Sequence, residues 1–79
     1  KTAYLIGDYA RGIDSGLIDI VLVGDINKSE LNRISEKRGK EISRKIRSLV
    51  LTKQELQHLW LQLGMNNALL IWGEPIKKL

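Results

Sequence analysis

The apolar run from Leu17 to Val23 constrains the fold of this chain more than any other stretch. Both alternating faces of the run are apolar except at Asp19, a pattern typical of a central strand that is covered on both sides. Burying an unpaired carboxylate costs several kcal/mol, so we expect Asp19 either beside a solvent-filled cleft at the strand end or next to a cation. That cation would be Arg11 or a metal ion, and both arrangements describe a functional site.

A shorter apolar segment precedes this run and is joined to it by glycine-rich sequence. Residues 3–6 predict a short strand, Gly7 permits a sharp exit from it, and Asp8 can cap the short helical turn that follows. Gly12 and Gly16 bracket a turn-rich link to the second strand. If this chain carries out chemistry, we expect it in this stretch.

Helices and strands alternate over the rest of the chain. Asn27 and Glu30 form the capping pattern of a helix in which Gly39 is a weak point or an early stop, and Thr52 with Glu55 forms a second capping box. The expected elements are a helix over about 28–42, a strand over 46–51, a helix from 53 that Gly64 ends, and a strand over 68–72.

The apolar residues of the two expected helices are assigned to the core. The first helix has Leu31, Ile34 and Ile42 on one face, and the second has apolar residues at helical spacing. In the second helix these residues are Leu56, Leu59, Trp60 and Leu63. His58, the only histidine, has no partner at catalytic or metal-binding spacing and is assigned to the surface.

This order of elements predicts a single α/β domain over residues 1–79, with a mixed sheet of about four strands and helices packed against it. The strand from Leu17 to Val23 is expected at its centre. A chain of 79 residues lies near the lower limit at which a core holds a fold without disulfides or metals. Because the chain begins without Met and almost directly inside a strand, we expect it to be a fragment of a longer chain.

The composition indicates in which cellular compartment the domain is expected. The chain has no cysteine, which excludes disulfides and thiolate metal sites and is typical of a reducing cytoplasm. No apolar stretch reaches the length of a membrane span, so we expect a cytoplasmic location and no membrane partner.

The net charge of +4 is unevenly distributed along the chain. The glycine-rich part is acidic, and the basic side chains gather between residues 37 and 47. They are Lys37, Arg38, Lys40, Arg44, Lys45 and Arg47. This segment could bind nucleic acid, but Glu36 and Glu41 interrupt it and no aromatic side chain is present to stack on bases. A solvated helix face is therefore the preferred interpretation, and nucleic-acid binding is the alternative.

Two short motifs lie in the glycine-rich stretch, Leu5-Ile6-Gly7 and Ala10-Arg11-Gly12, and Asp19 follows them in the next strand. In this arrangement the chain resembles the minimal nucleotidyltransferase domains of the DNA polymerase beta superfamily. Their pattern is apolar-Gly-Ser, usually continued as x-Ala-Arg-Gly, and then Asp-apolar-Asp-apolar in the next strand. Asp19 falls on the first metal-binding Asp of that pattern. The later elements follow the same order across nearly the whole chain, which implies a nucleotidyltransferase-like fold.

Departures from the family pattern bear on activity. Two carboxylates two residues apart on a strand point to the same face, where they hold metal ions together with a third carboxylate from a neighbouring strand. Val21 stands in place of the second Asp, and the strand over 46–51 contains no acid. Asp8 stands where the family has Ser, and its charge would repel a nucleotide phosphate. The resemblance therefore implies a degenerate domain that needs no cofactor, with Asp19 as a vestigial metal ligand.

Similar domains often lie behind an N-terminal helix-turn-helix in prokaryotic transcription regulators. The resemblance thus implies an effector-sensing or association module, in which a nucleotide or small effector would bind a cleft. The candidate cleft and phosphate-binding residues are Gly7, Asp8, Arg11 and Gly12. DNA contact would belong to a preceding domain. The apolar C-terminal strand around Trp72 indicates a homodimer if it lies at a sheet edge.

Alternatives to this interpretation stay open. The domain could be an active nucleotidyltransferase that moves a nucleoside monophosphate to a protein or small molecule, with Mg²⁺ on Asp19 and phosphate on Gly7 and Arg11. Asp8, Asp14 and Asp19 could instead form a relocated site. The glycine-rich stretch could also be a plain tight connection, in which Arg11 pairs with Asp14 or Asp19.

Overall fold

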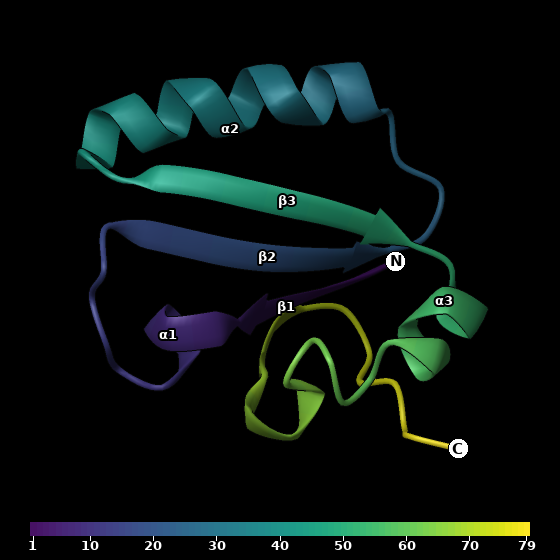
Figure 1. Ribbon diagram of the computed structural model, residues 1–79. Helices are drawn as coiled ribbons and strands as arrows, with labels where there is room; N and C mark the ends of the chain where they lie inside the picture. Colours follow the sequence, from purple (N-terminus) through teal and green to yellow (C-terminus); the bar gives the residue numbers. More distant parts are fainter.

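The computed structural model describes every residue from 1 to 79. Its elements follow the expected order (Figure 1), and their bounds are β1 Thr2–Ile6, α1 Gly7–Ala10, β2 Leu17–Val23, α2 Lys28–Ile42, β3 Lys45–Leu51, α3 Lys53–His58, the 3-10 helix η1 Met65–Asn67 and β4 Leu69–Trp72. The strands form one four-stranded mixed sheet with helices on both sides, so the predicted α/β fold class is confirmed. No helix combines the length and the apolar character needed to cross a membrane.

β2 is an inner strand of this sheet, as predicted. The strand order is β3-β2-β1-β4, with β2 parallel to β3 and β1 antiparallel to both of its neighbours. In register, Asp19 of β2 lies between Ile6 of β1 and Arg47 of β3. This register decides which side chain can reach the carboxylate of the central strand.

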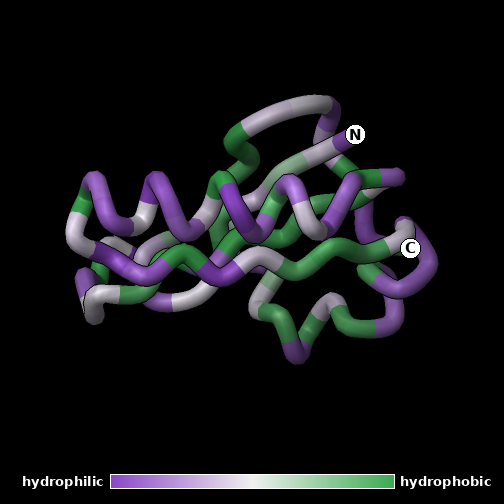
Figure 2. The backbone as a smooth tube through the Cα atoms, turned by 90° about the horizontal axis from the view of Figure 1, so that it is seen from above, coloured by the Kyte–Doolittle hydropathy of each residue, from purple (hydrophilic) through white to green (hydrophobic).

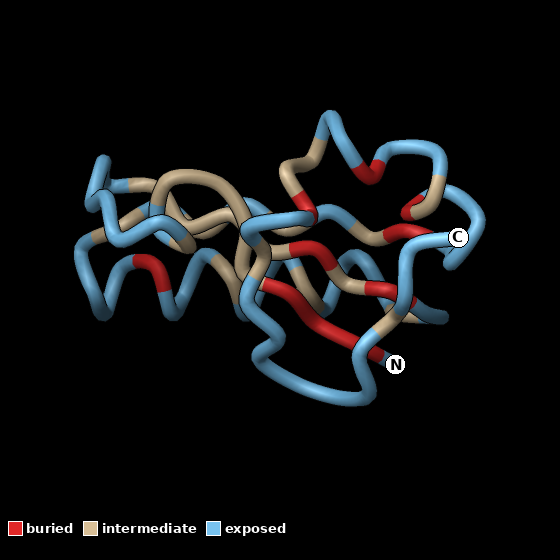
Figure 3. The backbone as a smooth tube through the Cα atoms, turned by 90° about the horizontal axis from the view of Figure 1, so that it is seen from below, coloured by how far each residue is buried: buried red, intermediate tan, exposed pale blue.

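The core lies on the sheet face that α3 and η1 cover. Val21 and Leu56 are fully buried there. The core is completed by Tyr4, Val23, Leu51, Trp60 and Met65. Seen from that side, most buried segments gather in the half of the molecule that holds both termini (Figure 3). Asp19 shares a face with Val21, because residues two apart on a strand point the same way, and it lies where this core ends.

α2 packs on β3 from the opposite face of the sheet. The side chain of Asn27 caps the helix as predicted, because it accepts a hydrogen bond from the backbone nitrogen of Glu30 at 3.0 Å. Gly39, however, does not stop the helix, which continues to Ile42. Gly39 is buried, and a Cβ there would lie 2.6 Å from the backbone oxygen of Arg44. Glycine thus lets the turn after the helix approach it closely.

The apolar face predicted for α2 is only partly buried. Leu31 is half-buried, but Ile34 and Ile42 are each 44% exposed. α2 packs mainly on β3, so the sheet face on this side is less completely covered than the face that carries the core.

α3 is shorter than predicted. Thr52 and Glu55 form the expected capping box, but the helix ends at His58 and residues 59–64 continue as turns. There the backbone hydrogen bonds change in part from the i−4 to the tighter i−3 pattern, as in the bond from Trp60 to the third residue before it. Trp60 is nevertheless in the core, as predicted. The apolar spacing indicated the burial of Leu56 and Trp60 correctly. Its assignment of Leu59 to the core is wrong, because the helix ends before Leu59 and this side chain is exposed, while Leu63 is half-buried.

The C-terminal tail, residues 73–79, is bound to the domain rather than frayed at its end. The hydroxyl of Thr2 donates a hydrogen bond to the backbone oxygen of Glu74 at 2.8 Å. The hydroxyl of Tyr4 accepts one from the backbone nitrogen of Ile76 at 2.7 Å. The first strand therefore holds the start of the tail.

Backbone close packing and a side-chain amide hold the rest of this segment. Gly73 has a φ of +87°, and a Cβ there would lie 2.2 Å from the backbone oxygen of Lys1. Farther along, the amide of Gln57 donates to the backbone oxygen of Lys77 at 2.7 Å and accepts from the backbone nitrogen of Leu79 at 3.0 Å. The last lysines thus belong to an anchored segment.

Candidate functional site

Gly7 brings the end of β1 against the carboxylate of Asp19. Its φ of +72° is a left-handed conformation that glycine adopts readily. A Cβ at this position would lie 3.0 Å from Oδ2 of Asp19. The turn and the close approach therefore both favour a residue without a side chain, and the predicted sharp exit from the first strand is confirmed.

The cation beside Asp19 is Arg47, not Arg11. Nε of Arg47 donates to Oδ1 of Asp19 at 2.7 Å, and Nη2 donates to Oδ2 at 2.9 Å. The two residues lie directly opposite each other on β2 and β3. The hydrogen bonds to Asp19, and then its charge, raise the pKa of Arg47. One guanidinium thus engages both oxygens of the only carboxylate in β2, in the paired geometry that arginine forms with carboxylates.

Asp8 lies inside α1 and does not cap it. The N-cap residue is Ile6, which makes no side-chain cap hydrogen bond. The backbone oxygen of Asp8 accepts hydrogen bonds from the backbone nitrogens of Arg11 and Ile13, at 3.0 and 2.9 Å. Its carboxylate Oδ1 is 2.5 Å from Nη2 of Arg11. The predicted cap is wrong because Asp8 occupies the first turn, where its carboxylate meets the side chain three residues later.

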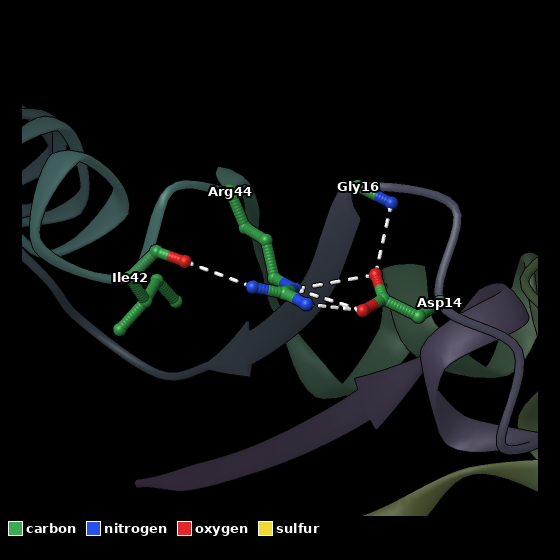
Figure 4. A network of polar contacts seen from close by, with 4 residues as sticks. All are labelled: Asp14, Gly16, Ile42 and Arg44. Atoms are coloured by element: carbon green, nitrogen blue, oxygen red, sulfur yellow. Dashed lines mark hydrogen bonds and ion pairs between the residues drawn. The ribbon is translucent and has the colours of Figure 1, made fainter.

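A third ion pair joins the loop before β2 to the turn before β3 (Figure 4). The carboxylate of Asp14 accepts hydrogen bonds from Nη2 and Nε of Arg44, those from Nε at 3.2 and 3.1 Å, and one from the backbone nitrogen of Gly16 at 3.1 Å. Nη1 of Arg44 donates to the backbone oxygen of Ile42 at 2.9 Å. The bonds from Arg44 and Gly16 lower the pKa of Asp14, and the bonds to Asp14 raise the pKa of Arg44.

Three arginines therefore hold three aspartates apart. Asp8, Asp14 and Asp19 each face a different arginine. No three carboxylate or histidine side chains converge in an arrangement that could hold a metal ion. The relocated site of these three aspartates is not assembled, and Arg11 pairs with neither Asp14 nor Asp19.

Gly7 and Arg11 line a small cleft of about 210 Å³. Its other wall comes from the connection between α3 and β4, which sequence reasoning missed. The residues of that wall are Leu61, Gln62, Leu63, Gly64 and Asn67. Because β4 runs antiparallel to β1 and begins beside Leu5, the segment before β4 must return to the end of β1. The wall was missed because the sequence does not indicate which strand the last strand pairs with.

Gly12 and Asp8 do not line this cleft. Gly12 borders a separate hollow together with Tyr9, Ile13 and Asp14, and Asp8 lines neither of the two. The candidate phosphate-binding residues are thus close in sequence but do not share one cleft.

The basic segment between residues 37 and 47 has fewer free cations than its sequence indicates. All of its arginines are bound to acidic side chains. The pairs are Arg38–Glu41, Arg44–Asp14 and Arg47–Asp19. Lys40 and Lys45 line a groove of about 450 Å³ between α2 and β3, but Glu36 lines the same groove. The segment is a surface of mixed charge, which favours the solvated-face interpretation.

Comparison with known proteins supplies no relative from which a role could be transferred. No family model, no curated protein and no solved structure matches this chain. A function must therefore be inferred from the contacts within the chain itself.

Proposed function

We propose that this chain is a catalytically degenerate domain, similar to the minimal nucleotidyltransferases of the DNA polymerase beta superfamily, and that it serves as an association or effector-sensing module of a transcription regulator. The observation that carries the loss of catalysis is the double hydrogen bond from Arg47 to both oxygens of Asp19. The sequence resemblance around Gly7 and Arg11 supplies the family and the regulator context.

The Arg47–Asp19 pair opposes metal binding in two ways. A divalent cation needs carboxylate oxygens as ligands, and both oxygens of Asp19 already accept hydrogen bonds from Arg47. The guanidinium charge would also repel a cation brought to the same carboxylate. Arg47 lies on the neighbouring strand, from which the family pattern takes its third carboxylate, so an opposite charge replaces the expected ligand.

Val21 opposes catalysis through the core. Val21 is fully buried in the cluster that contains Leu56. An aspartate in its place would put an unpaired charge among apolar side chains, which costs several kcal/mol. A buried core residue, Val21, therefore stands at the position where the family pattern has its second metal ligand.

The cleft beside Gly7 suits a small polar ligand better than a nucleoside triphosphate. Its volume of about 210 Å³ is below the range of about 300–1,000 Å³ that is typical of pockets for drug-sized ligands. Arg11 is the only charged residue of its lining, and Gln62 and Asn67 supply amide groups. A small anion or polar effector could take over the bond that Arg11 now makes to Asp8.

Transfer from labelled ATP, GTP, CTP and UTP in the presence of Mg²⁺ is the direct test. We expect no label on any protein or small-molecule acceptor. The Arg47→Ala variant should also stay inactive, because it frees Asp19 but leaves Val21 without a ligand atom. Magnesium-dependent labelling by the unaltered chain that disappears in Asp19→Ala would overturn the proposal and establish the active nucleotidyltransferase.

Calorimetry with the same nucleotides and with inorganic phosphate separates effector sensing from association. Binding that Arg11→Ala weakens and Arg33→Ala leaves unchanged would identify the cleft as an effector site. Arg33 is a suitable control because it also pairs with an acid three residues away in sequence, on the exposed surface of α2. Absence of binding would leave association as the role of the domain.

A further inference from the structure

β4 is an edge strand made only of large apolar residues. Leu69, Leu70, Ile71 and Trp72 are 51%, 41%, 51% and 60% exposed. β4 pairs only with β1, and outside the sheet no backbone hydrogen bond involves its residues. Seen from the side of α2, the strand lies at the rim of the molecule (Figure 2). β4 therefore presents unpaired backbone groups and apolar side chains at the same place.

The opposite edge strand, β3, is protected against pairing. Exposed residues alternate along it and include Lys45 and Arg47. Charged side chains of this kind discourage the pairing of sheet edges. β4 has no charge, no proline and no exposed polar residue. Only one of the two edges thus has the features that keep a strand unpaired.

The surface area of the domain also leaves room for a partner. A folded monomer of this mass, 9.0 kDa, exposes about 4,850 Å² on average. This chain exposes 5624 Å². The isolated chain thus exposes about 770 Å² more than an average monomer of its mass.

An open apolar sheet face continues from the β4 edge. Leu5 lies opposite both Ile20 and Leu69 in register, so the three side chains share one face. This is the α2 face, because Ile20 is in register with Ser48, whose hydroxyl lies 3.2 Å from that of Ser35 in α2. Leu5 and Ile20 are only half-buried there, and Leu69 is exposed. A partner at the edge could cover this face as well.

We propose that a second copy of this chain covers β4, with the two β4 strands paired antiparallel across a twofold axis. This pairing joins two sheets into one and buries the same residues on both sides. Charge favours a second copy over a partner of opposite charge, because β4 is uncharged and the basic segment lies at the β3 edge. Two copies can therefore meet through β4 without bringing their basic segments together.

Sedimentation equilibrium of the 79-residue chain tests this pairing. We expect a dimer whose dissociation constant rises at least about tenfold in Ile71→Lys, since a charge at the centre of an apolar interface is poorly tolerated. Leu49→Lys on β3 is the matched control, because Leu49 is also exposed, at 42%, and lies on the other edge strand. A chain that stays monomeric at millimolar concentration would overturn the proposal. So would equal weakening by the two variants, or assembly beyond the dimer.

Cysteine crosslinking keeps the test decisive if Ile71→Lys does not fold. The chain has no cysteine, so Leu70→Cys and Ile71→Cys each introduce one thiol. At least one of these variants should form a disulfide-linked dimer under mild oxidation, and Leu49→Cys should not. Crosslinking through Leu49→Cys alone would place the interface at β3 and refute the proposal.

This inference rests on the association role in the proposed function, but its readout is separate. Dimer formation reports on β4, whereas label transfer and calorimetry report on the cleft. A dimer that β4 substitutions dissociate, in a chain that transfers nucleotides, would sustain the inference and refute the proposed loss of catalysis. A monomer that transfers no nucleotide would refute the inference and sustain the proposed loss of catalysis.

Discussion

Along β2, the half that ends at Val23 and the half that begins at Leu17 are stabilised by different forces. Val21 and Val23 are buried in the apolar core beneath α3 and η1. Asp19, at the other end of the same face, is bound by Arg47 at the surface. The neighbouring loop is also held by charge, through the pair of Asp14 and Arg44.

Because of this difference, the fold and the candidate site depend on different kinds of interaction. Burial of apolar surface responds weakly to ionic strength and to mild changes of pH, whereas exposed ion pairs are screened by salt and titrate. Substitutions in the core half should therefore act on stability. Substitutions in the ion-paired half should change the site with little loss of fold.

The largest effect is expected from Leu56→Ala in the core half. Leu56 is fully buried, and truncation of a buried leucine lowers the free energy of unfolding by about 2–5 kcal/mol. Denaturant unfolding followed by circular dichroism measures the loss. Leu61→Ala is the control, because Leu61 is 68% exposed and should change stability by less than about 0.5 kcal/mol. Similar losses in the two variants would contradict the assignment of the core.

A smaller but clear effect is expected from Gly73→Ala. Gly73 has a φ of +87°, and the added Cβ would overlap the backbone oxygen of Lys1. Gly12→Ala is the control that measures the cost of the positive φ without a steric clash. Gly12 has a φ of +80°, but nothing lies within 4 Å of its Cβ position. We expect Gly12→Ala to cost about 1–2 kcal/mol and Gly73→Ala to cost more, as measured by thermal unfolding. Equal costs would show that the approach of Gly73 to Lys1 is not tight.

The smallest effect is expected in the ion-paired half, from pH and Asp14→Asn. Because the folded state lowers the pKa of Asp14, this carboxylate adds stability above its unfolded pKa of about 3.9. That contribution is lost as the pH falls through the lower pKa of the folded state. Asp14→Asn should lower the unfolding midpoint slightly at neutral pH and low salt, and the difference from the unaltered chain should disappear in acid.

Asp25→Asn is the control for this titration, because Asp25 forms no ion pair. It should not lower the midpoint at neutral pH. If high salt left the effect of Asp14→Asn undiminished, the loop would be held by something other than charge.

Local signals predicted most of the elements. Asn27 and Thr52 marked the starts of two helices through side-chain caps that the structure contains. The apolar run from Leu17 to Val23 identified an inner strand. The expected cover on both faces is only partly present, because Ile20 and Leu22 on the α2 face are half-buried. The end of α3 at His58 was missed because the turns after it are fixed by packing around Trp60, not by a helix stop signal.

The partner of Asp19 depended on pairing between strands that are distant in sequence. Arg47 reaches Asp19 because β2 and β3 are parallel and Leu17 is in register with Lys45. The observed start of β3 at Lys45 places Arg47 opposite Asp19, whereas alignment of Leu17 with the predicted start at residue 46 would have placed Ser48 there. The role of Gly39 was likewise hidden, because it depends on the path of the chain after α2 and not on the helix itself.

The position of β1 between β2 and β4 also has a consequence for folding kinetics. β2 follows β1 closely in sequence, but the strand that pairs with the other edge of β1 is the last one in the chain. The bond between Thr2 and Glu74 closes a loop of nearly the whole chain. Closing long loops slows folding, because their entropy is lost before distant contacts form. During synthesis β1 therefore cannot complete its second pairing until residues 69–72 have left the ribosome.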